Sequence, residues 1–167
     1  VVNADDPTVL ELARQGRAAM RPFSRSQGLM NGTTVEDGWV VSRDRARTEK
    51  LLPLSAVHLL GSHLVDDVLA AATVGVLVGV TPTVMTAAVD AFRGLEHAME
   101  VVAEVQGVRF VNDSKATNVE AARRSVESFD ADVVPIMGGR FKGGNLEILR
   151  VPLAARARAV VTIGEAA

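Results

Sequence analysis

The chain has 167 residues, a formal net charge of -2, 48% apolar residues and 23% charged residues. This length suits one ordinary domain or two small ones, and the composition supports a packed core and argues against disorder. The near-neutral charge gives no basis for electrostatic binding of nucleic acid, and the absence of cysteine excludes a disulfide framework and a thiolate metal site.

Both ends of the sequence resemble the interior of a domain. The chain opens on V-V-N-A-D-D-P, a strand end followed by a turn, and closes on A-V-V-T-I-G-E-A-A, a strand followed by a turn. We therefore expect a segment of a longer protein. The longest apolar runs, such as residues 74–80, are far too short to span a bilayer, and the first residues do not predict a signal peptide.

The first part of the chain is predicted to hold short strands, with a helix before them and helices after them. The helices are expected at residues 8–16, 64–78 and 82–92. Asp37 and Gly38 lie between β-rich runs, which predicts a tight hairpin within the strand region 20–57. Gly79 is placed to end the second helix, and Thr81 to cap the third, with proline following it.

The second part alternates strands with helices. Strands are expected at residues 100–105, 108–112, 133–137 and 159–164, and helices at 118–129 and 146–157. Thr117 and Glu120 have capping-box spacing, with Thr117 as the N-cap, and Pro152 is a candidate break in the last helix. From residue 108 onward this order predicts a doubly wound parallel sheet. The change of pattern at 92–99 predicts a junction between two domains, 1–93 and 94–167.

Polar side chains gather where the strand 108–112 ends. Asp113 can accept a hydrogen bond from a ribose hydroxyl, Ser114 can donate to a phosphate oxygen, and Lys115 adds a cation. Thr117 lies where a helix N-terminus favours anions. Ligands of open α/β sheets bind at such strand ends, which makes this turn a candidate site. The alternative is a plain helix cap at Ser114 and Thr117, beside an exposed ion pair of Asp113 with Lys115.

A glycine-rich loop, G-G-R-F-K-G-G at 138–144, follows another predicted strand. Its glycines permit close approach of the backbone to a ligand, and Arg140 and Lys142 add positive charge. An ordinary loop with solvated bases is the alternative, and the phosphate-binding pattern G-x-x-x-x-G-K-S/T occurs nowhere in the sequence. The remaining polar candidates are interpreted as structural or solvated, namely His58, His63 and His97, and the helix-end acids Asp5, Asp6, Asp66 and Asp67.

Several stretches resemble, in order and spacing, motifs of the Mur ligase family. They are V-V-N-A-D-D-P, L-L-G-S-H-L-V-D-D-V-L-A-A-A-T-V-G, F-R-G-L-E-H-A-M-E-V-V, N-D-S-K-A-T-N, I-M-G-G-R-F-K-G-G-N and V-V-T-I-G-E-A-A. The heptapeptide at 112–118 is the most specific of them, and its Ala116, Thr117 and Asn118 resemble the members that add D-glutamate. The resemblance covers nearly the whole chain.

This resemblance implies an α/β protein in which part of a Mur ligase central ATPase domain is followed by a partial Rossmann-like C-terminal domain. It implies an ATP-dependent, amide-forming ligase of peptidoglycan synthesis in the cytoplasm, a monomer with no nucleic-acid or membrane partner. The substrates would be UDP-N-acetylmuramoyl-L-alanine and D-glutamate, and the cofactors ATP and Mg²⁺, with most magnesium ligands outside these residues. The 167 residues alone would have no ligase activity, because they carry no P-loop.

The resemblance also implies roles for individual residues. Lys115 and His63 would be catalytic; Asp113, Ser114, Lys115, His97 and Asp67 would bind ATP; Thr117 and Lys142 would hold the D-glutamate carboxylates. Three positions depart from the pattern: Leu64 and Asp67 stand where the family has Asn, and Ala98 where it has Arg. The resemblance places all three positions near the bound ATP. They leave open a degenerate, non-catalytic binding module of the same descent, and an unrelated nucleotide-binding α/β domain is a third alternative.

Overall fold

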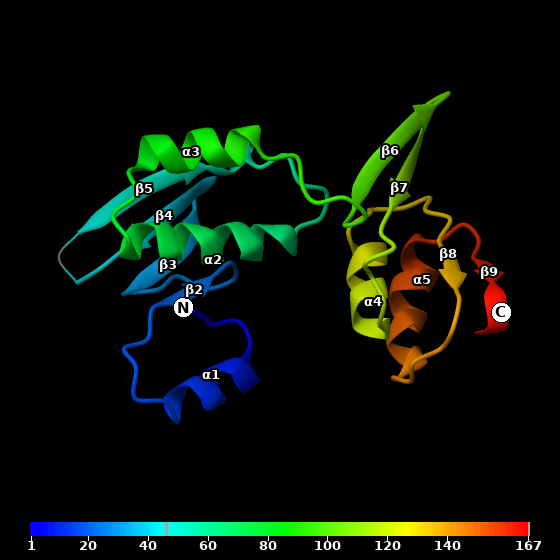
Figure 1. Cartoon of the computed structure of the whole chain (residues 1–167), viewed down its shortest axis with the longest axis horizontal. Coiled ribbons are helices and arrows are strands. Elements are labelled where there is room, and N and C mark those ends of the chain that lie inside the picture. The colour runs from blue at the N-terminus through cyan, green and yellow to red at the C-terminus, as the bar shows by residue number, and fades with distance from the viewer. Residues whose placement is uncertain (46, 167) are drawn as a thin grey trace. The chain divides into compact units, whose positions relative to one another are not determined.

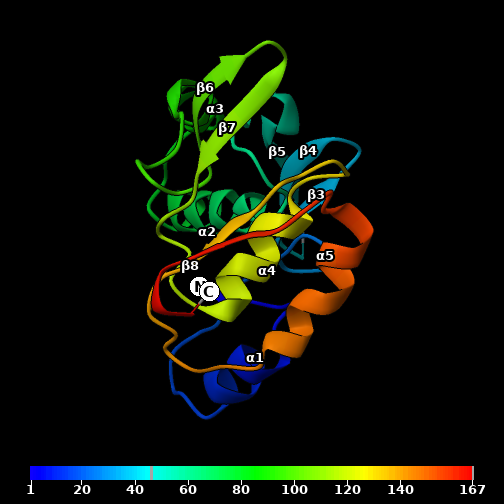
Figure 2. The same cartoon turned by 90° about the vertical axis from the view of Figure 1, so that its right-hand side faces the viewer.

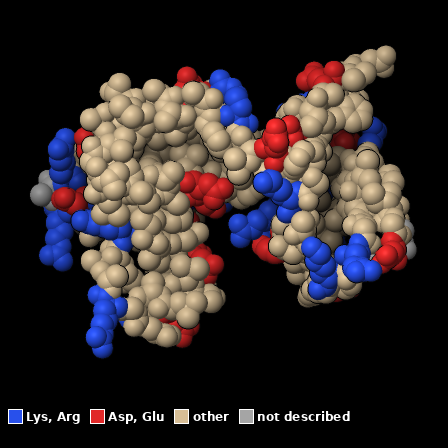
Figure 3. Space-filling view, viewed as in Figure 1, with Lys and Arg blue, Asp and Glu red and all other residues tan. Residues whose placement is uncertain are grey.

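The computed structural model describes residues 1–45 and 47–166 of the chain. It divides into two compact units, Val1–Arg93 and Gly94–Ala167 (Figure 1). In the view of Figure 3, most of the surface of each unit is uncharged, and both Lys or Arg and Asp or Glu side chains occur on each unit. This mixed pattern agrees with the formal net charge of -2.

The first unit is a five-stranded sheet with helices. Its strands, in spatial order, are β1 (Val2–Asn3), β2 (Pro22–Ser24), β3 (Gly32–Glu36), β4 (Trp39–Arg43) and β5 (Thr48–Pro53). Its helices are α1 (Pro7–Arg14), α2 (Leu64–Leu77) and α3 (Pro82–Ala91), with a 3-10 turn, η1 (Leu54–Ala56). Pairing is parallel from β1 to β3 and antiparallel from β3 to β5. The helices predicted in this part of the chain are confirmed.

Local sequence explains the turns of this unit. Asp37 and Gly38 have φ of 46° and 77° between β3 and β4, the left-handed pair that a two-residue hairpin turn requires, so the predicted hairpin is confirmed. Helix α2 ends where predicted: Gly79 has φ of 78°, and the Val80 N–H donates to the Gly75 carbonyl at 2.9 Å. This closing bond belongs to the glycine-terminated Schellman motif.

The apolar core of the first unit lies between the sheet and its helices. Helix α2 packs against β2, β3 and β4, and α3 packs against β5. Leu52 and Leu69 are fully buried at the centre of the cluster. The core residues are Phe23, Val40, Leu51, Leu52, Val68, Leu69, Ala72 and Met85. This burial of apolar surface fixes the N-terminal end of α2, where His63 and Asp67 stand.

The second unit holds two small sheets and two α-helices. Its strands are β6 (Glu100–Val105), β7 (Val108–Asn112), β8 (Ile136–Gly138) and β9 (Val161–Ile163). Its helices are α4 (Val119–Glu127) and α5 (Arg150–Arg156), with 3-10 turns η2 (Leu146–Leu149) and η3 (Gly164–Ala166). Helices α4 and α5 pack side by side, as Figures 1 and 2 both show.

The expected parallel sheet is smaller than the sequence predicts. Strand β7 pairs antiparallel with β6, and among the described residues of the second unit only β8 and β9 form a parallel ladder. The reason is the tight turn at Gln106 and Gly107, both with positive φ, because a two-residue connection can join only antiparallel neighbours. The strand expected at 133–137 is also shorter, since Val133 makes an isolated bridge to Ala157 before β8 begins.

Pro152 does not break the last helix, contrary to expectation. The α-helical part begins at Arg150, so the proline is in its first turn, where a backbone N–H needs no partner within the helix. The irregular part comes earlier, as the 3-10 turn η2. Within residues 1–45 and 47–166, no helix combines the length and the apolar character needed to cross a membrane.

Candidate functional site

The turn 112–118 begins at the last residue of β7 and ends just before α4. Its backbone is closed by short-range hydrogen bonds, from Ser114 N–H to Asn112 Oδ1 at 3.1 Å and from Thr117 N–H to the Lys115 carbonyl at 2.8 Å. The helix cap is Asn118, whose Oδ1 accepts the Ala121 N–H at 2.8 Å. The prediction of Thr117 as the cap is therefore wrong by one residue, because Asn118 is extended and its short amide reaches the first turn.

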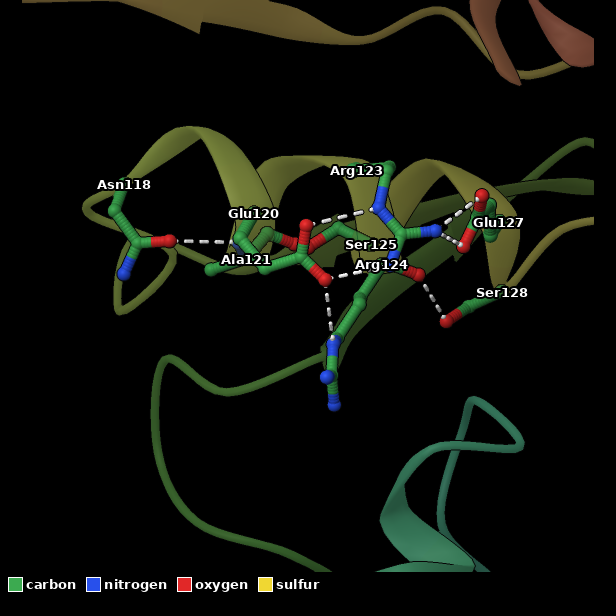
Figure 4. A network of polar contacts seen from close by, with 8 residues as sticks. All are labelled: Asn118, Glu120, Ala121, Arg123, Arg124, Ser125, Glu127 and Ser128. Atoms are coloured by element: carbon green, nitrogen blue, oxygen red, sulfur yellow. Dashed lines mark hydrogen bonds and ion pairs between the residues drawn. The ribbon is translucent and has the colours of Figure 1, made fainter. Parts of the chain in front are cut away.

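Glu120 does not complete a capping box. Its carboxylate pairs with Arg123 at 2.5 Å and with Arg124 at 3.2 Å, and Arg123 also bonds Glu127 (Figure 4). Hydrogen bonds from Arg123, opposed by partial burial and reinforced by Arg124, lower the pKa of Glu120 to about 2. These pairs stand at helical i, i+3 and i, i+4 spacing on an exposed surface, where each adds only a few tenths of a kcal/mol.

Asp113 is held from two sides. Its Oδ1 accepts the Met99 N–H at 3.0 Å, and its Oδ2 accepts the hydroxyl proton of Ser125 from α4. The side chain is half-buried. An exposed ion pair with Lys115, one alternative from the sequence, is not formed in the structure. The carboxylate instead ties the start of the β6–β7 hairpin to helix α4.

His97 adjoins the same turn. Its carbonyl accepts the Lys115 N–H at 3.0 Å, and its ring Nδ1 lies 2.8 Å from the Asn112 amide nitrogen. Its own N–H donates to Glu100 Oε2 at 2.8 Å. His97 has φ of 66° and Met99 φ of 51°, so this loop holds two non-glycine residues in the left-handed region. Such conformations persist where surrounding contacts fix them, and here the turn 112–118 supplies those contacts.

The side chains of Ser114, Lys115 and Thr117 point to no partner. All three are exposed, and none forms a side-chain hydrogen bond or ion pair with another residue in the described part of the chain. They stand just before the first turn of α4, where backbone N–H groups and the helix dipole favour an anion. The turn therefore carries an exposed cation and two exposed hydroxyls.

The glycine-rich loop 138–144 meets this region at the first residue of α4. A Cβ on Gly144 would stand 2.9 Å from Val119 Cγ2, so the loop backbone lies against the helix start. Lys142 is exposed and has no partner among the described residues, whereas Arg140 lies 3.4 Å from Glu165. Six of the predicted site residues lie in the second unit, on the turn, the 94–99 loop and the glycine-rich loop: Asp113, Ser114, Lys115, Thr117, His97 and Lys142. Hydrogen bonds join the turn to His97, whereas the glycine-rich loop contacts the start of α4 at Val119.

The remaining two predicted residues belong to the first unit. His63 is the half-buried N-cap of α2, and Asp67 is exposed in the first turn of that helix beside half-buried Leu64. Asp66 pairs with Arg25 at 2.9 Å, so of the two neighbouring acids only Asp66 has an ion-pair partner among the described residues. No cluster of three or more His, Cys, Asp or Glu suited to a metal ion occurs in the described ranges.

The prediction that Asp5 is a solvated helix-end acid is wrong. Its carboxylate accepts the hydroxyls of Ser24 and Ser26, each at 2.6 Å, and the Arg25 N–H at 2.8 Å. Burial raises the pKa of Asp5, but the hydrogen bonds from Ser24, Ser26 and the backbone outweigh it and lower the pKa to about 2. Its neighbour Asp6 does act at a helix end, as the N-cap of α1. The serine at the end of β2 was the signal that could have indicated this clamp.

Replacing Asp5 with Asn is expected to destabilise the first unit by on the order of 1–2 kcal/mol at neutral pH, allowing for partial exposure. The folded pKa lies below the ordinary 3.8, so this stability is present above pH 4 and is lost as the pH falls toward 2. Urea unfolding at pH 7 and pH 2.5 would measure it. Asp6→Asn is the matched control, because asparagine caps a helix as well as aspartate. An undiminished Asp5→Asn effect at pH 2.5 would contradict the assignment.

Comparison with known proteins gives this site its context. No family model matches the chain. It is 42% identical over 169 residues to a UDP-N-acetylmuramoylalanine--D-glutamate ligase of Acidobacterium capsulatum and 35% identical over 167 residues to that of Bacillus subtilis. Both alignments cover the whole chain, which spans 37% and 36% of those proteins.

A solved structure agrees at the level of the fold. It is the UDP-N-acetylmuramoylalanyl-D-glutamyl-2,6-diaminopimelate--D-alanyl-D-alanyl ligase from Acinetobacter baumannii, with a TM-score of 0.57 and 13% identity over 96% of this chain and 42% of that one. The fold is that of part of a Mur ligase. More narrowly, the sequence is homologous from end to end to UDP-N-acetylmuramoylalanine--D-glutamate ligases, and it spans about 37% of their length.

Proposed function

We propose that the chain is the part of a D-glutamate-adding Mur ligase that runs from the late central domain into the C-terminal domain. Residues 1–93 would be the later part of the ATP-binding central domain, and 94–167 the first part of the Rossmann-like domain. The end-to-end identity of 42% to a curated ligase is the observation that carries this proposal. The substrates are UDP-N-acetylmuramoyl-L-alanine and D-glutamate, with ATP and Mg²⁺, in a cytoplasmic monomer.

The reaction forms one amide bond. The carboxylate of UDP-N-acetylmuramoyl-L-alanine would accept the terminal phosphoryl group of ATP, with release of ADP, and the amine of D-glutamate would then attack the acyl phosphate, lose a proton and displace phosphate. Asp113 holds the ribose, and Ser114 and Lys115 meet the phosphates. Thr117 and Lys142, from the two loops that meet at α4, hold the D-glutamate carboxylates. Catalysis of this kind rests on positioning and on charge stabilisation.

The structure supports these roles through the side chains that it leaves available. Thr117 is not the helix cap, so its hydroxyl is not committed to α4. Lys115 has no acidic partner among the described residues, and an unpaired cation at the start of α4 suits a phosphate or a carboxylate. The roles of His63 and Asp67, at the start of α2 in the first unit, rest on the family resemblance alone, whereas His97 lies in the loop beside the turn.

The test uses the full-length protein that carries this sequence. Phosphate release should require ATP, UDP-N-acetylmuramoyl-L-alanine and D-glutamate together, and Lys115→Ala should lower kcat by about 100-fold or more, as loss of one charge-stabilising group does elsewhere. Lys50→Ala removes a cation that lies 4.8 Å from the centre of the Trp39 ring and serves as the control. The 167 residues alone should give no turnover, because they contain no phosphate-binding P-loop.

A non-catalytic binding module of the same descent is the second candidate. Leu64, Asp67 and Ala98, which depart from the family pattern on the ATP side, favour it. A folded full-length protein that binds D-glutamate but releases no phosphate would support this candidate and contradict the ligase.

A further inference from the structure

Ser125 lies in the middle of α4 and has no role in the proposed function, yet it contacts Asp113, which has one. Its hydroxyl donates to Asp113 Oδ2, and it also stands 2.9 Å from the Ala121 carbonyl one helical turn before. A hydroxyl has one proton to donate. The ionised carboxylate is the stronger acceptor, so the bond to Asp113 dominates and the contact with Ala121 is secondary.

The contacts with Met99 and Ser125 leave part of the hydrogen-bonding capacity of the Asp113 carboxylate unused. The Met99 N–H occupies one lone pair of Oδ1 at 3.0 Å, and Ser125 occupies one of Oδ2. An ionised carboxylate has about four acceptor sites, so one lone pair on each oxygen remains for a ligand. With a donor on each oxygen, the carboxylate cannot rotate about its Cβ–Cγ bond without losing a bond at one end. Both Asp113 and Ser125 are half-buried, which limits competition from water.

We propose that Ser125 is a positioning residue for the nucleotide site: it fixes the Asp113 carboxylate so that both oxygens are presented to the vicinal hydroxyls of the ATP ribose. This inference rests on the proposed role of Asp113 and adds a residue that carries no ligand contact itself. Two parallel hydrogen bonds to one carboxylate have strict geometry. A carboxylate anchored only through Met99 could present one oxygen in several orientations, and a ribose diol would then lose one of its two bonds.

The test compares ATP with 2′,3′-dideoxy-ATP in the full-length protein. Wild type should bind ATP about tenfold or more tightly than the dideoxy analogue, the scale of losing hydrogen bonds to a charged group. Ser125→Ala should raise the KM for ATP about fivefold and leave kcat and the KM for D-glutamate within about twofold. The preference for ATP over the analogue should fall by a similar factor. Ser125→Thr keeps a hydroxyl at the same atom and should restore the preference.

A double-mutant cycle separates positioning from general loss of stability. If Ser125 acts through Asp113, then Ser125→Ala should have no further effect on nucleotide preference when Asp113 is already alanine. Equal, additive losses in both backgrounds would overturn the proposal, as would a Ser125→Ala variant that keeps the full preference of the wild type. A wild type that binds both nucleotides equally would overturn the ribose role of Asp113, and the positioning role with it. All three results leave the ligase proposal to its own test, the release of phosphate, and only the third removes the ribose role that the proposed function gives to Asp113.

Discussion

Replacing Gly138 with Ala is expected to destabilise the second unit by about 3 kcal/mol or more, through a backbone clash at the end of β8. A Cβ at this position would stand 1.8 Å from the Ile163 carbonyl oxygen and 2.9 Å from the Ile163 nitrogen. Both atoms belong to β9, the strand paired with β8, so the clash can be relieved only by opening the ladder. The φ of 147° adds strain, because only glycine populates that region readily.

Gly139→Ala is the matched control for this variant. The neighbouring glycine also has a positive φ, 97°, but an added Cβ would meet nothing within 4 Å. Gly139→Ala should lower the free energy of unfolding only through the strain of a positive φ, by roughly 1–2 kcal/mol. Urea unfolding followed by far-UV circular dichroism would compare the two variants with wild type. Equal midpoints for Gly138→Ala and Gly139→Ala would show that the contact with Ile163 does not limit the position.

The helices and the hairpins could be predicted because their signals are local. Glycine at a left-handed position, proline in a first turn and apolar spacing all act within a few residues of the feature that they specify. Gly79, Gly38 and Gly107 each mark an observed turn. The cap of α4 was misplaced because Thr117 and Asn118 are both good caps, and only the backbone path after the turn selects between them.

Contacts between segments that are distant in the sequence could not be predicted from such local signals. Nothing near Asp5 in the sequence indicates that Ser24 and Ser26 will surround its carboxylate. The bond from Ser125 to Asp113 likewise joins a helix to the turn before it, at a separation that no motif describes. The predicted site residues on the turn and the two loops were found from the motif resemblance, whereas the contacts that hold them depend on packing in three dimensions.

The double variant Asp67→Asn with Ala98→Arg is expected to strengthen ATP binding by the full-length protein more than tenfold. This hypothesis rests on the proposed function and on the family resemblance at these two positions. The pair should recover on the order of 2–5 kcal/mol, a sum of one removed repulsion and one regained charge-assisted contact. Asparagine can donate to an adenine nitrogen, whereas ionised aspartate only accepts and repels a polyphosphate.

Neither change removes a hydrogen bond or an ion pair that is formed among the described residues. Asp67 is exposed and has no ion-pair partner among the described residues, so its replacement costs only its interaction with the N-terminal end of α2, about 0.3–1 kcal/mol. Ala98 is half-buried, and its N–H donates to the Leu95 carbonyl, a bond that an arginine backbone keeps. Neither substitution removes a side-chain contact that holds its unit together.

Asp66→Asn provides the control for charge alone. It changes the net charge of α2 by the same amount as Asp67→Asn, but Asp66 pairs with Arg25 at 2.9 Å and is less exposed. Titration calorimetry should therefore show a gain in ATP affinity for the double variant and none for Asp66→Asn. A similar gain from both would mean that the reduction in negative charge acts at long range. Equal affinities for wild type and double variant would mean that the site has compensated elsewhere for Asp67 and Ala98, or that these two positions do not face the nucleotide.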